Sequence, residues 1–317
     1  SYSTEVKRFS DLCINKVLAS EQKGIGSSSL QLNSNQTKQL LSQCNACYRT
    51  KINELLLASL LLGVQRWSGQ QSLRLDLEGH GREELTPELE LNRTVGWFTS
   101  IYPLTLSLGL DSSLPDFICA VKEQYRSVPD NGIGFGVLKE LTNLIDVSEH
   151  DSSELVFNYL GQFDQVVNVD THFTGAPESS GQEISSRRAP DHPLSLNGMV
   201  SGECLSFNLS FDKSVYSQSF MDDLMISFKT SLTDIITHCM ELSWGRYSPS
   251  DFPLTTVDSG SLSQWGIDTD ESVEDLYPAT GMQQGLLFHS LLEQGSYVTQ
   301  TVLTFERLDV DCFQQAW

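Results

Sequence analysis

Apolar residues recur at intervals of three and four in several parts of this chain. Such spacing predicts helices over residues 34–48, 51–67, 114–128 and 218–242. The segment 51–67 is apolar on most of its faces, so we expect it to be buried. In the segment 218–242, one stripe at helical spacing predicts a long helix that packs along it: Phe220, Leu224, Phe228, Leu232 and Ile235.

Other segments have the period of two that is typical of strands. In "SLRLDLEGHG" (72–81), three leucines point one way and polar side chains point the other way, namely Arg74, Asp76, Glu78 and His80. Three further segments are predicted strands or hairpins: 94–108, 153–163 and 193–212. Within the first of them, Pro103 indicates a sheet edge or a strand end. Because helices and strands do not alternate as regular βαβ units, the pattern predicts an α+β fold.

The character of the sequence changes after the last of these helices. The chain becomes rich in Ser and Asp and poor in long apolar runs, which is typical of a linker. Helical patterning restarts at "YPATGMQQGLLFHSLL", where Thr280 is the expected helix cap. We therefore expect a first domain at 1–246, an interdomain linker at 247–275 and the start of a second domain at 276–317. The chain lacks an initial Met and ends soon after the candidate N-cap Asp311, so it reads as a piece of a longer protein.

Composition limits the binding partners and the cellular compartment that we expect for this protein. The net charge of −21 repels nucleic acid and anionic membranes, and no basic run offsets it. The longest apolar run, residues 55–64, is too short to span a bilayer. Seven scattered cysteines fit a reducing cytosol, so we expect a cytoplasmic protein. Cys44 and Cys47 lie in a helical pattern without a second pair, which favours a structural role over redox or zinc chemistry.

The stretch "DLEGHGREE" (76–84) carries the candidate chemistry. Glu78, His80 and Arg82 alternate with Gly79 and Gly81, so the strand period places Glu78 and His80 on one face with room beside them. One interpretation is a solvated strand end. The other is a carboxylate that faces a cavity and is tuned for proton transfer. The residues of this stretch alone leave both interpretations open.

Three motifs in the same order bear on that choice. "EGHGRE", "NRTVGWFTSIYPLTL" and "FNYLGQF" resemble the signature motifs of epimerization domains of nonribosomal peptide synthetases, as do "YRTKINELLLASLL" and "RRAPDHPLSLNG". The resemblance covers roughly residues 30 to 246. Further along, "YPATGMQQGLLFHSLL" resembles the first motif of a condensation domain, of the type that follows an epimerization domain and accepts a D-configured donor.

The resemblance implies a fold and a reaction. It implies a two-lobed fold similar to chloramphenicol acetyltransferase, with a tunnel between the lobes. A neighbouring carrier domain would deliver an aminoacyl or peptidyl thioester on 4'-phosphopantetheine, and the α-proton would be removed and returned to give the D form. The implied partners are the upstream carrier domain, the downstream condensation domain and an N-terminal lobe. No metal, directly bound cofactor, nucleic acid or membrane is implied.

The resemblance also implies roles for seven residues. Glu78 would be one acid/base, and Tyr159 would position or donate a proton beside Asn158, although Tyr159 could equally be a packed core tyrosine. The other residues of these motifs would support the site or shape the tunnel: His80, Arg82, Arg93 and Trp97.

One motif of the family is missing. The resemblance implies a second acid/base in a His-His-x-x-x-Asp motif, but the six histidines of this chain are all isolated: His80, His150, His172, His192, His238 and His289. We therefore expect the chain to begin after the first lobe and to be inactive alone. Two alternatives stay open. The first unit could be a condensation-type domain that forms amide bonds, or a non-catalytic lobe that docks carrier domains.

Overall fold

The chain folds as two compact units, Ser1–Glu274 and Asp275–Trp317. The computed structural model describes residues 24–83, 90–91, 93–107, 109, 113–142, 153–162, 181, 191–242, 245–292 and 300–316. Among these residues, no helix is both long and apolar enough to cross a lipid bilayer.

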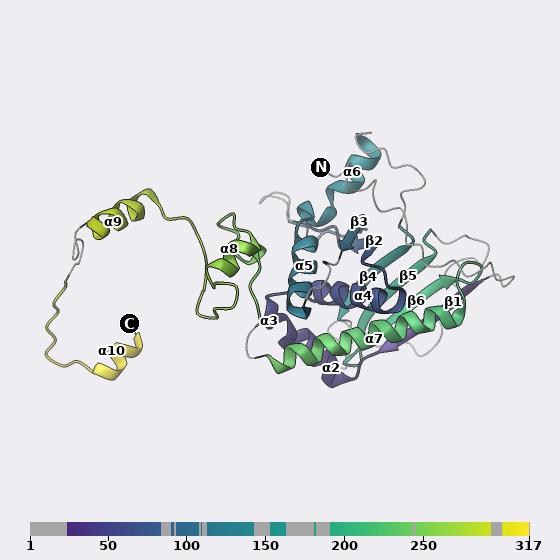
Figure 1. Cartoon of the computed structure of the whole chain (residues 1–317), viewed down its shortest axis with the longest axis horizontal. Helices are drawn as coiled ribbons and strands as arrows, with labels where there is room; N and C mark the ends of the chain where they lie inside the picture. The colour runs from purple at the N-terminus through teal and green to yellow at the C-terminus, as the bar shows by residue number, and fades with distance from the viewer. Residues whose placement is uncertain are drawn as a thin grey trace. The chain divides into compact units, whose positions relative to one another are not determined.

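A six-stranded mixed sheet organises the first unit (Figure 1), with the strand order β1-β6-β5-β4-β2-β3. The strands are β1 (Ile25–Gln31), β2 (Ser72–Gly79), β3 (Ser100–Ser107), β4 (Leu155–Gln162), β5 (Leu194–Ser201) and β6 (Cys204–Asp212). The pairs β2/β4 and β4/β5 are parallel, and the other three pairs are antiparallel. This sheet and its covering helices confirm the predicted α+β fold.

Two long helices cover one face of the sheet. Helices α4 (Ile52–Ser68) and α7 (Gln218–Glu241) lie side by side over the strands. Their contact is close at Gly63, where an added Cβ would lie 2.8 Å from the Cα of Phe228 on α7. The predicted burial of 51–67 and the predicted stripe of 218–242 are both confirmed, because the residues concerned form one core.

The remaining helices of the first unit are shorter. The predicted helix 34–48 is present as α2 (Ser34–Lys38), a π-helical turn (Gln39–Cys44) and α3 (Asn45–Tyr48). The predicted helix 114–128 is α5 (Leu114–Arg126), which begins after the Ser113 cap with Pro115 in its first turn. A 3₁₀ turn (Pro129–Gly132) and α6 (Gly134–Leu141) follow it.

The strand alternation in 72–81 is confirmed. Leu73, Leu75 and Leu77 are at most 3% exposed and belong to the core under the helices. The polar residues between them therefore lie on the other face of the sheet. The predicted strand 94–108 begins only at Ser100, and Pro103 sits in β3, which among the described strands is at the sheet edge beside β2. An edge position suits proline because its nitrogen has no hydrogen to donate.

The segment predicted as a linker packs on the first unit up to Glu274. It forms a 3₁₀ turn (Pro249–Asp251) and α8 (Ser259–Gln264), and it buries Tyr247, Phe252 and Leu262. The Ser- and Asp-rich composition predicts a linker, but this segment is folded. The identity of the two flanking domains stays a prediction.

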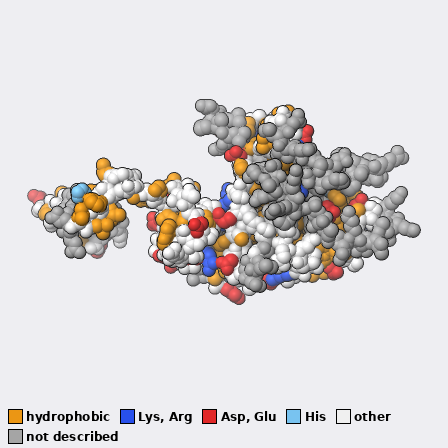
Figure 2. Space-filling view, turned by 45° about the horizontal axis from the view of Figure 1, so that its top comes forward, with side chains coloured by type: hydrophobic (Ala, Val, Ile, Leu, Met, Phe, Trp, Pro, Cys, Tyr) orange, Lys and Arg blue, Asp and Glu red, His pale blue; other side chains and the backbone are white. Residues whose placement is uncertain are grey.

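The second unit contains α9 (Gly281–Leu292) and α10 (Val310–Ala316). Thr280 caps α9 as predicted, since its hydroxyl accepts the backbone N–H of Gln283 at 3.3 Å. Neither helix buries a residue. Figure 2 shows apolar side chains over the surface of this unit, and several on α9 are more than half exposed: Leu287, Phe288, Leu291 and Leu292.

The approach of α4 and α7 yields a stability prediction. We expect Gly63→Ala to destabilise the protein by about 1–3 kcal/mol, because the methyl group pushes against the backbone of α7. Gly136→Ala is the matched control: its Cβ meets nothing within 4 Å, so better helix propensity should raise stability by no more than about 1 kcal/mol. Urea denaturation followed by circular dichroism measures both. A Gly63→Ala variant as stable as the wild type would contradict the prediction.

Candidate functional site

Glu78 and Asn158 meet on the sheet face opposite α4 and α7. Strands β2 and β4 are parallel, with Asp76 beside Val156 and Leu77 beside Phe157. Continuing this register places Glu78 next to Asn158 on one face. The side-chain amide of Asn158 donates a hydrogen bond of 2.6 Å to Oε2 of Glu78. The structure thus joins two predicted site residues that lie 80 positions apart in the sequence.

The environment of Glu78 favours its protonated form. Burial raises the pKa of Glu78 above its ordinary value, and the nearby His192 opposes this rise. The amide of Asn158 fixes the carboxyl oxygen Oε2, and within the described part of the chain no hydrogen bond engages the other oxygen. A carboxyl group held in this way can take up and return a proton closer to neutral pH than an exposed glutamate can.

A second carboxylate lies on the same face, two positions earlier on β2. Oδ1 of Asp76 accepts the hydroxyl of Ser153 at 2.6 Å, and Oδ2 lies 2.7 Å from Nε2 of His192. Burial by itself raises the pKa of Asp76, but the hydrogen bonds from His192 and Ser153 outweigh it, so the net pKa is below the ordinary value. Asp76 is therefore held ionised while Glu78 is pushed toward protonation, a separation that is typical of acid/base sites.

No role was predicted from the sequence for Asp76, Ser153 or His192, although Asp76 begins "DLEGHGREE" and His192 lies in the motif "RRAPDHPLSLNG". The alternation in 72–81 places Asp76 on the same face as Glu78, so this pattern could have predicted that Asp76 lies near the site. His192 lies 116 residues from Asp76, just before β5. No local pattern could have indicated that contact.

Tyr159 lies on the other side of the sheet. It follows Asn158 directly, and successive side chains of a strand point to opposite faces. Tyr159 packs against the hydrophobic core with Phe157, and burial raises the pKa of its hydroxyl. The geometry thus separates Tyr159 from the Glu78–Asn158 pair, and the expected catalytic role of Tyr159 has no support from a contact in this structure.

Arg82 holds the loop that follows β2. Its guanidinium donates to the backbone carbonyls of Leu91, Thr94 and Gly96, and it lies 4.4 Å from the ring centroid of Phe98. The neighbouring Gly81 has φ of +63°, and a Cβ there would lie 1.5 Å from the carbonyl oxygen of Phe98. Residues 94–99 are therefore tied to the end of β2 instead of extending β3. This geometry agrees with the supporting role expected for Arg82.

The other three predicted residues lie at the surface of the described part. His80 has a 69% exposed side chain, and its Nδ1 accepts the backbone N–H of Arg82 at 3.0 Å. Arg93 is exposed, and Trp97 is 92% exposed. The described contacts link none of the three to Glu78, so the supporting role expected for His80 and the tunnel roles expected for Arg93 and Trp97 stay predictions. Among the described residues, no three His, Cys, Asp or Glu side chains gather as metal ligands would.

Known proteins resemble this chain over most of its length. The profile of the family described as "Condensation domain" matches residues 15–244. The chain is 41% identical over 294 residues to a subunit of the linear gramicidin synthase of Brevibacillus parabrevis, and 34% identical over 287 residues to bacitracin synthase 3 of Bacillus licheniformis. These alignments cover 91% and 88% of this chain but only 4% of each relative, so the chain spans a small part of their length.

Solved structures agree with this match. The epimerization domain from the third module of tyrocidine synthetase B superposes with a TM-score of 0.63 and 31% identity, over 71% of this chain and 51% of that one. The EpoB cyclization-docking bidomain of Sorangium cellulosum superposes with a TM-score of 0.50 and 16% identity, over 71% and 43%, which concerns the fold alone. The predicted fold, a lobe of the condensation and epimerization superfamily, is confirmed.

The two carboxylates should affect stability in opposite ways. Because the pKa of Asp76 is lowered on folding, its ionised form stabilises the folded state at pH values above the ordinary pKa of 3.8. This stabilisation is lost as the pH falls through the lower folded pKa. A raised pKa means that ionised Glu78 destabilises the folded state as the pH rises through that pKa. At pH 7 we expect Asp76→Asn to be less stable than the wild type and Glu78→Gln to be at least as stable.

Thermal unfolding between pH 3 and pH 8 tests this pair, since the deficit of Asp76→Asn should shrink below about pH 4. The glutamine at position 78 keeps an acceptor for Asn158, so the comparison isolates the charge. If Glu78→Gln loses as much stability at pH 7 as Asp76→Asn does, the prediction that folding lowers the pKa of Asp76 and raises that of Glu78 is wrong.

Arg82 yields a separate prediction. Arg82→Lys should loosen residues 93–99, because an ammonium group cannot reach three carbonyls and stack on Phe98 as the guanidinium does. We expect faster cleavage by chymotrypsin at Trp97 and Phe98, with a stability loss of about 1 kcal/mol. The exposed Arg93→Lys is the control and should leave both quantities unchanged. Equal cleavage rates in the two variants would show that Arg82 does not hold residues 93–99 in place.

Proposed function

The chain belongs to the condensation-domain family of nonribosomal peptide synthetases, and we propose that its first unit is the C-terminal part of an epimerization domain. Two findings support this choice. The motifs "EGHGRE" and "FNYLGQF" supply the two residues that meet in the site, Glu78 and Asn158. The solved epimerization domain of tyrocidine synthetase B is similar over about half of its own length.

The proposed reaction is proton transfer at the α-carbon of a thioester-bound residue. Domains of this family act on substrates carried on the phosphopantetheine of a carrier domain and need no cofactor of their own. A thioester acidifies its α-carbon, so one carboxylate of suitable pKa can remove the proton on one face. Return of a proton to the opposite face gives the D form.

Glu78 is the proposed acid/base of this chain. Its hydrogen bond from Asn158 is the observation that carries the proposal, because it orients a half-buried carboxyl group whose pKa burial raises. Asn158 holds the carboxyl oxygen Oε2 in place while the other oxygen exchanges the proton. Asp76, held ionised by Ser153 and His192, lies two positions earlier on β2 and gives the same face a second carboxylate.

A second acid/base must act on the opposite face of the α-carbon. The resemblance assigns it to the His-His-x-x-x-Asp motif, which this sequence does not contain. We therefore propose that an N-terminal lobe outside this sequence completes the site. We expect no α-proton exchange by the present chain alone.

The second unit is proposed to begin a condensation domain that accepts the D-configured product. Its first helix carries the motif "YPATGMQQGLLFHSLL". An alignment that covers 91% of the 317 residues must extend beyond the first unit, which ends at Glu274. The gramicidin synthase relative therefore shares sequence across the boundary. The apolar side chains of α9 are also what a domain core would bury.

Two alternative functions predict different outcomes for the carrier-bound substrate. A condensation-type domain would form an amide bond between two carrier-bound substrates, and a docking lobe would bind a carrier domain without changing its cargo. Incubation of the complete domain with its loaded carrier in deuterated water separates the three. Deuterium at the α-position supports epimerization, a new amide bond supports condensation, and an unchanged thioester supports docking.

The same assay tests Glu78. In the complete domain, Glu78→Gln should lower the rate of deuterium incorporation at least about 100-fold, since general acid/base catalysis contributes that much or more. Glu90→Gln removes an exposed charge from the loop after β2 and should leave the rate unchanged. Exchange at the wild-type rate in Glu78→Gln would exclude Glu78 as the acid/base.

A further inference from the structure

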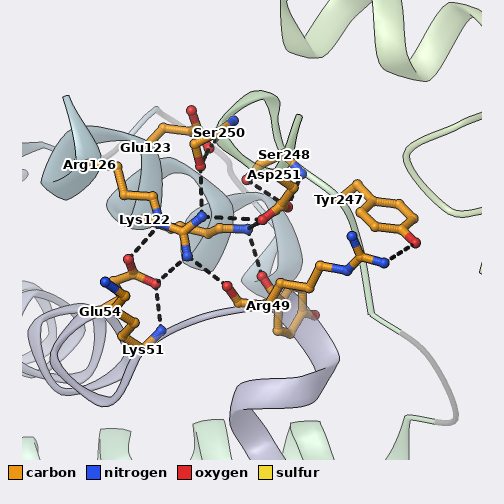
Figure 3. Close-up of polar contacts among 11 residues, drawn as sticks. Arg49, Lys51, Glu54, Lys122, Glu123, Arg126, Tyr247, Ser248, Ser250 and Asp251 are labelled. Carbon is orange, nitrogen blue, oxygen red and sulfur yellow. Dashed lines mark hydrogen bonds and ion pairs between the residues drawn. The ribbon is translucent and has the colours of Figure 1, made fainter. Parts of the chain in front are cut away.

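Buried charges tie the segment 245–274, here called the exit segment, to helix α5 (Figure 3). Lys122 on α5 is fully buried, and its Nζ lies 2.7 and 2.6 Å from the two carboxylate oxygens of Asp251, whose side chain is 2% exposed. The same Nζ donates to the backbone carbonyl of Tyr48 at 2.7 Å. The Lys122 ammonium is therefore solvated by protein oxygens in place of water.

Arg126 joins this pair to the start of α4. Its Nη1 lies 3.2 Å from Oδ1 of Asp251, and its Nε lies 2.7 Å from Oε1 of Glu54. Glu54 is itself 1% exposed and caps the N-terminus of α4 by accepting the backbone N–H of Lys51. Asp251 thus neutralises one buried cation and shares a second with Glu54, as the dashed lines in Figure 3 indicate.

The exit segment fits this surface with more than one side chain. Ser250 donates its hydroxyl to Glu123 of α5 at 2.6 Å. Phe252 is fully buried and lies 5.2 Å from the ring of Tyr247, over which the guanidinium of Arg49 stacks at 4.1 Å. The sequence Tyr-Ser-Pro-Ser-Asp-Phe therefore offers a carboxylate, a hydroxyl and two aromatic rings to matching partners.

The segment is also closed on itself. The backbone N–H of Tyr247 donates to the carbonyl of Asp268 at 2.8 Å, and the hydroxyl of Ser263 donates to the Asp268 carboxylate at 2.8 Å. Residues 247 and 268 are thus neighbours, with α8 between them in the sequence. The segment binds as a folded loop whose N-terminal part carries the charge.

We propose that the surface formed by Tyr48, Arg49, Glu54, Lys122, Glu123 and Arg126 is a docking site for the exit segment, and that its occupation completes the first unit. The unit then extends to Glu274, beyond the family match, which ends at residue 244. Asp251 is the specificity residue, because both of its carboxylate oxygens contact the Lys122 ammonium, and without that carboxylate the docked segment would bury the charge unpaired. The last residues of the first unit are then those of the exit segment and not those at the end of α7. This proposal is independent of the proposed function.

The test uses the full chain and hydrogen exchange. Asp251→Asn keeps the shape but removes the charge, so we expect the amides of Tyr247, Ser248 and Phe252 to exchange at least about a hundredfold faster while the amides of β6 stay protected. Glu271→Gln is the matched control, because it removes an exposed charge from the same segment and should change nothing. Wild-type protection of the exit segment in Asp251→Asn would overturn the proposal.

A double variant covers the case in which Asp251→Asn unfolds the whole unit. Lys122→Met with Asp251→Asn leaves no unpaired ammonium in the core, so the β6 amides should regain protection. If the exit segment still exchanges fast in that variant, its docking depends on the ion pair as proposed. If it is as protected as in the wild type, apolar contacts alone hold it and the proposal fails.

Discussion

The parallel pairing of β2 with β4 is the constraint on which the candidate site depends. Leu77 and Phe157 pair in this register and both lie in the core beneath α4 and α7. A slip of one residue would turn Phe157 out of the core and Asn158 away from Glu78. The free energy of core burial therefore fixes the register, and the register in turn fixes the hydrogen bond between the amide and the carboxyl group. The chemistry of one sheet face is set by the packing of the other.

The two carboxylates on that face, Asp76 and Glu78, have different hydrogen-bond partners. Asp76 accepts hydrogen bonds at both oxygens, which keeps it charged despite its burial, whereas Glu78 accepts one from the amide of Asn158. Ionisation of Asp76 therefore stabilises the folded state, whereas ionisation of Glu78 destabilises it, because burial raises the pKa of Glu78. The raised pKa of Glu78 is the property that the proposed proton transfer would use. The tight contact of α4 with α7 at Gly63 is part of the packing that supports the site.

Buried charge has a structural role elsewhere in the first unit. Lys122, Arg126, Glu54 and Asp251 form a network in which each charge has an opposite partner, and the network joins α4, α5 and the exit segment. Ion pairs of this kind add little net stability but penalise every arrangement that separates them. A Ser- and Asp-rich segment that has few apolar residues can in this way be folded against the protein. Composition predicts a linker there because the decisive carboxylate finds its ammonium partner 129 residues away.

Most secondary-structure elements of the first unit and one half of the candidate site follow from the amino-acid sequence. Periods of two and of three to four identified β2, α4 and α7, because each reflects which side of one element is buried, and the motif around Glu78 marked the acidic residue. The remaining features required the folded chain. It placed Asn158 on the face of Glu78 and Tyr159 on the core side, brought His192 and Ser153 to Asp76, and paired Lys122 with Asp251. Such contacts depend on strand order and on register across long stretches of chain, and the physical forces that set these act only when distant segments pack together.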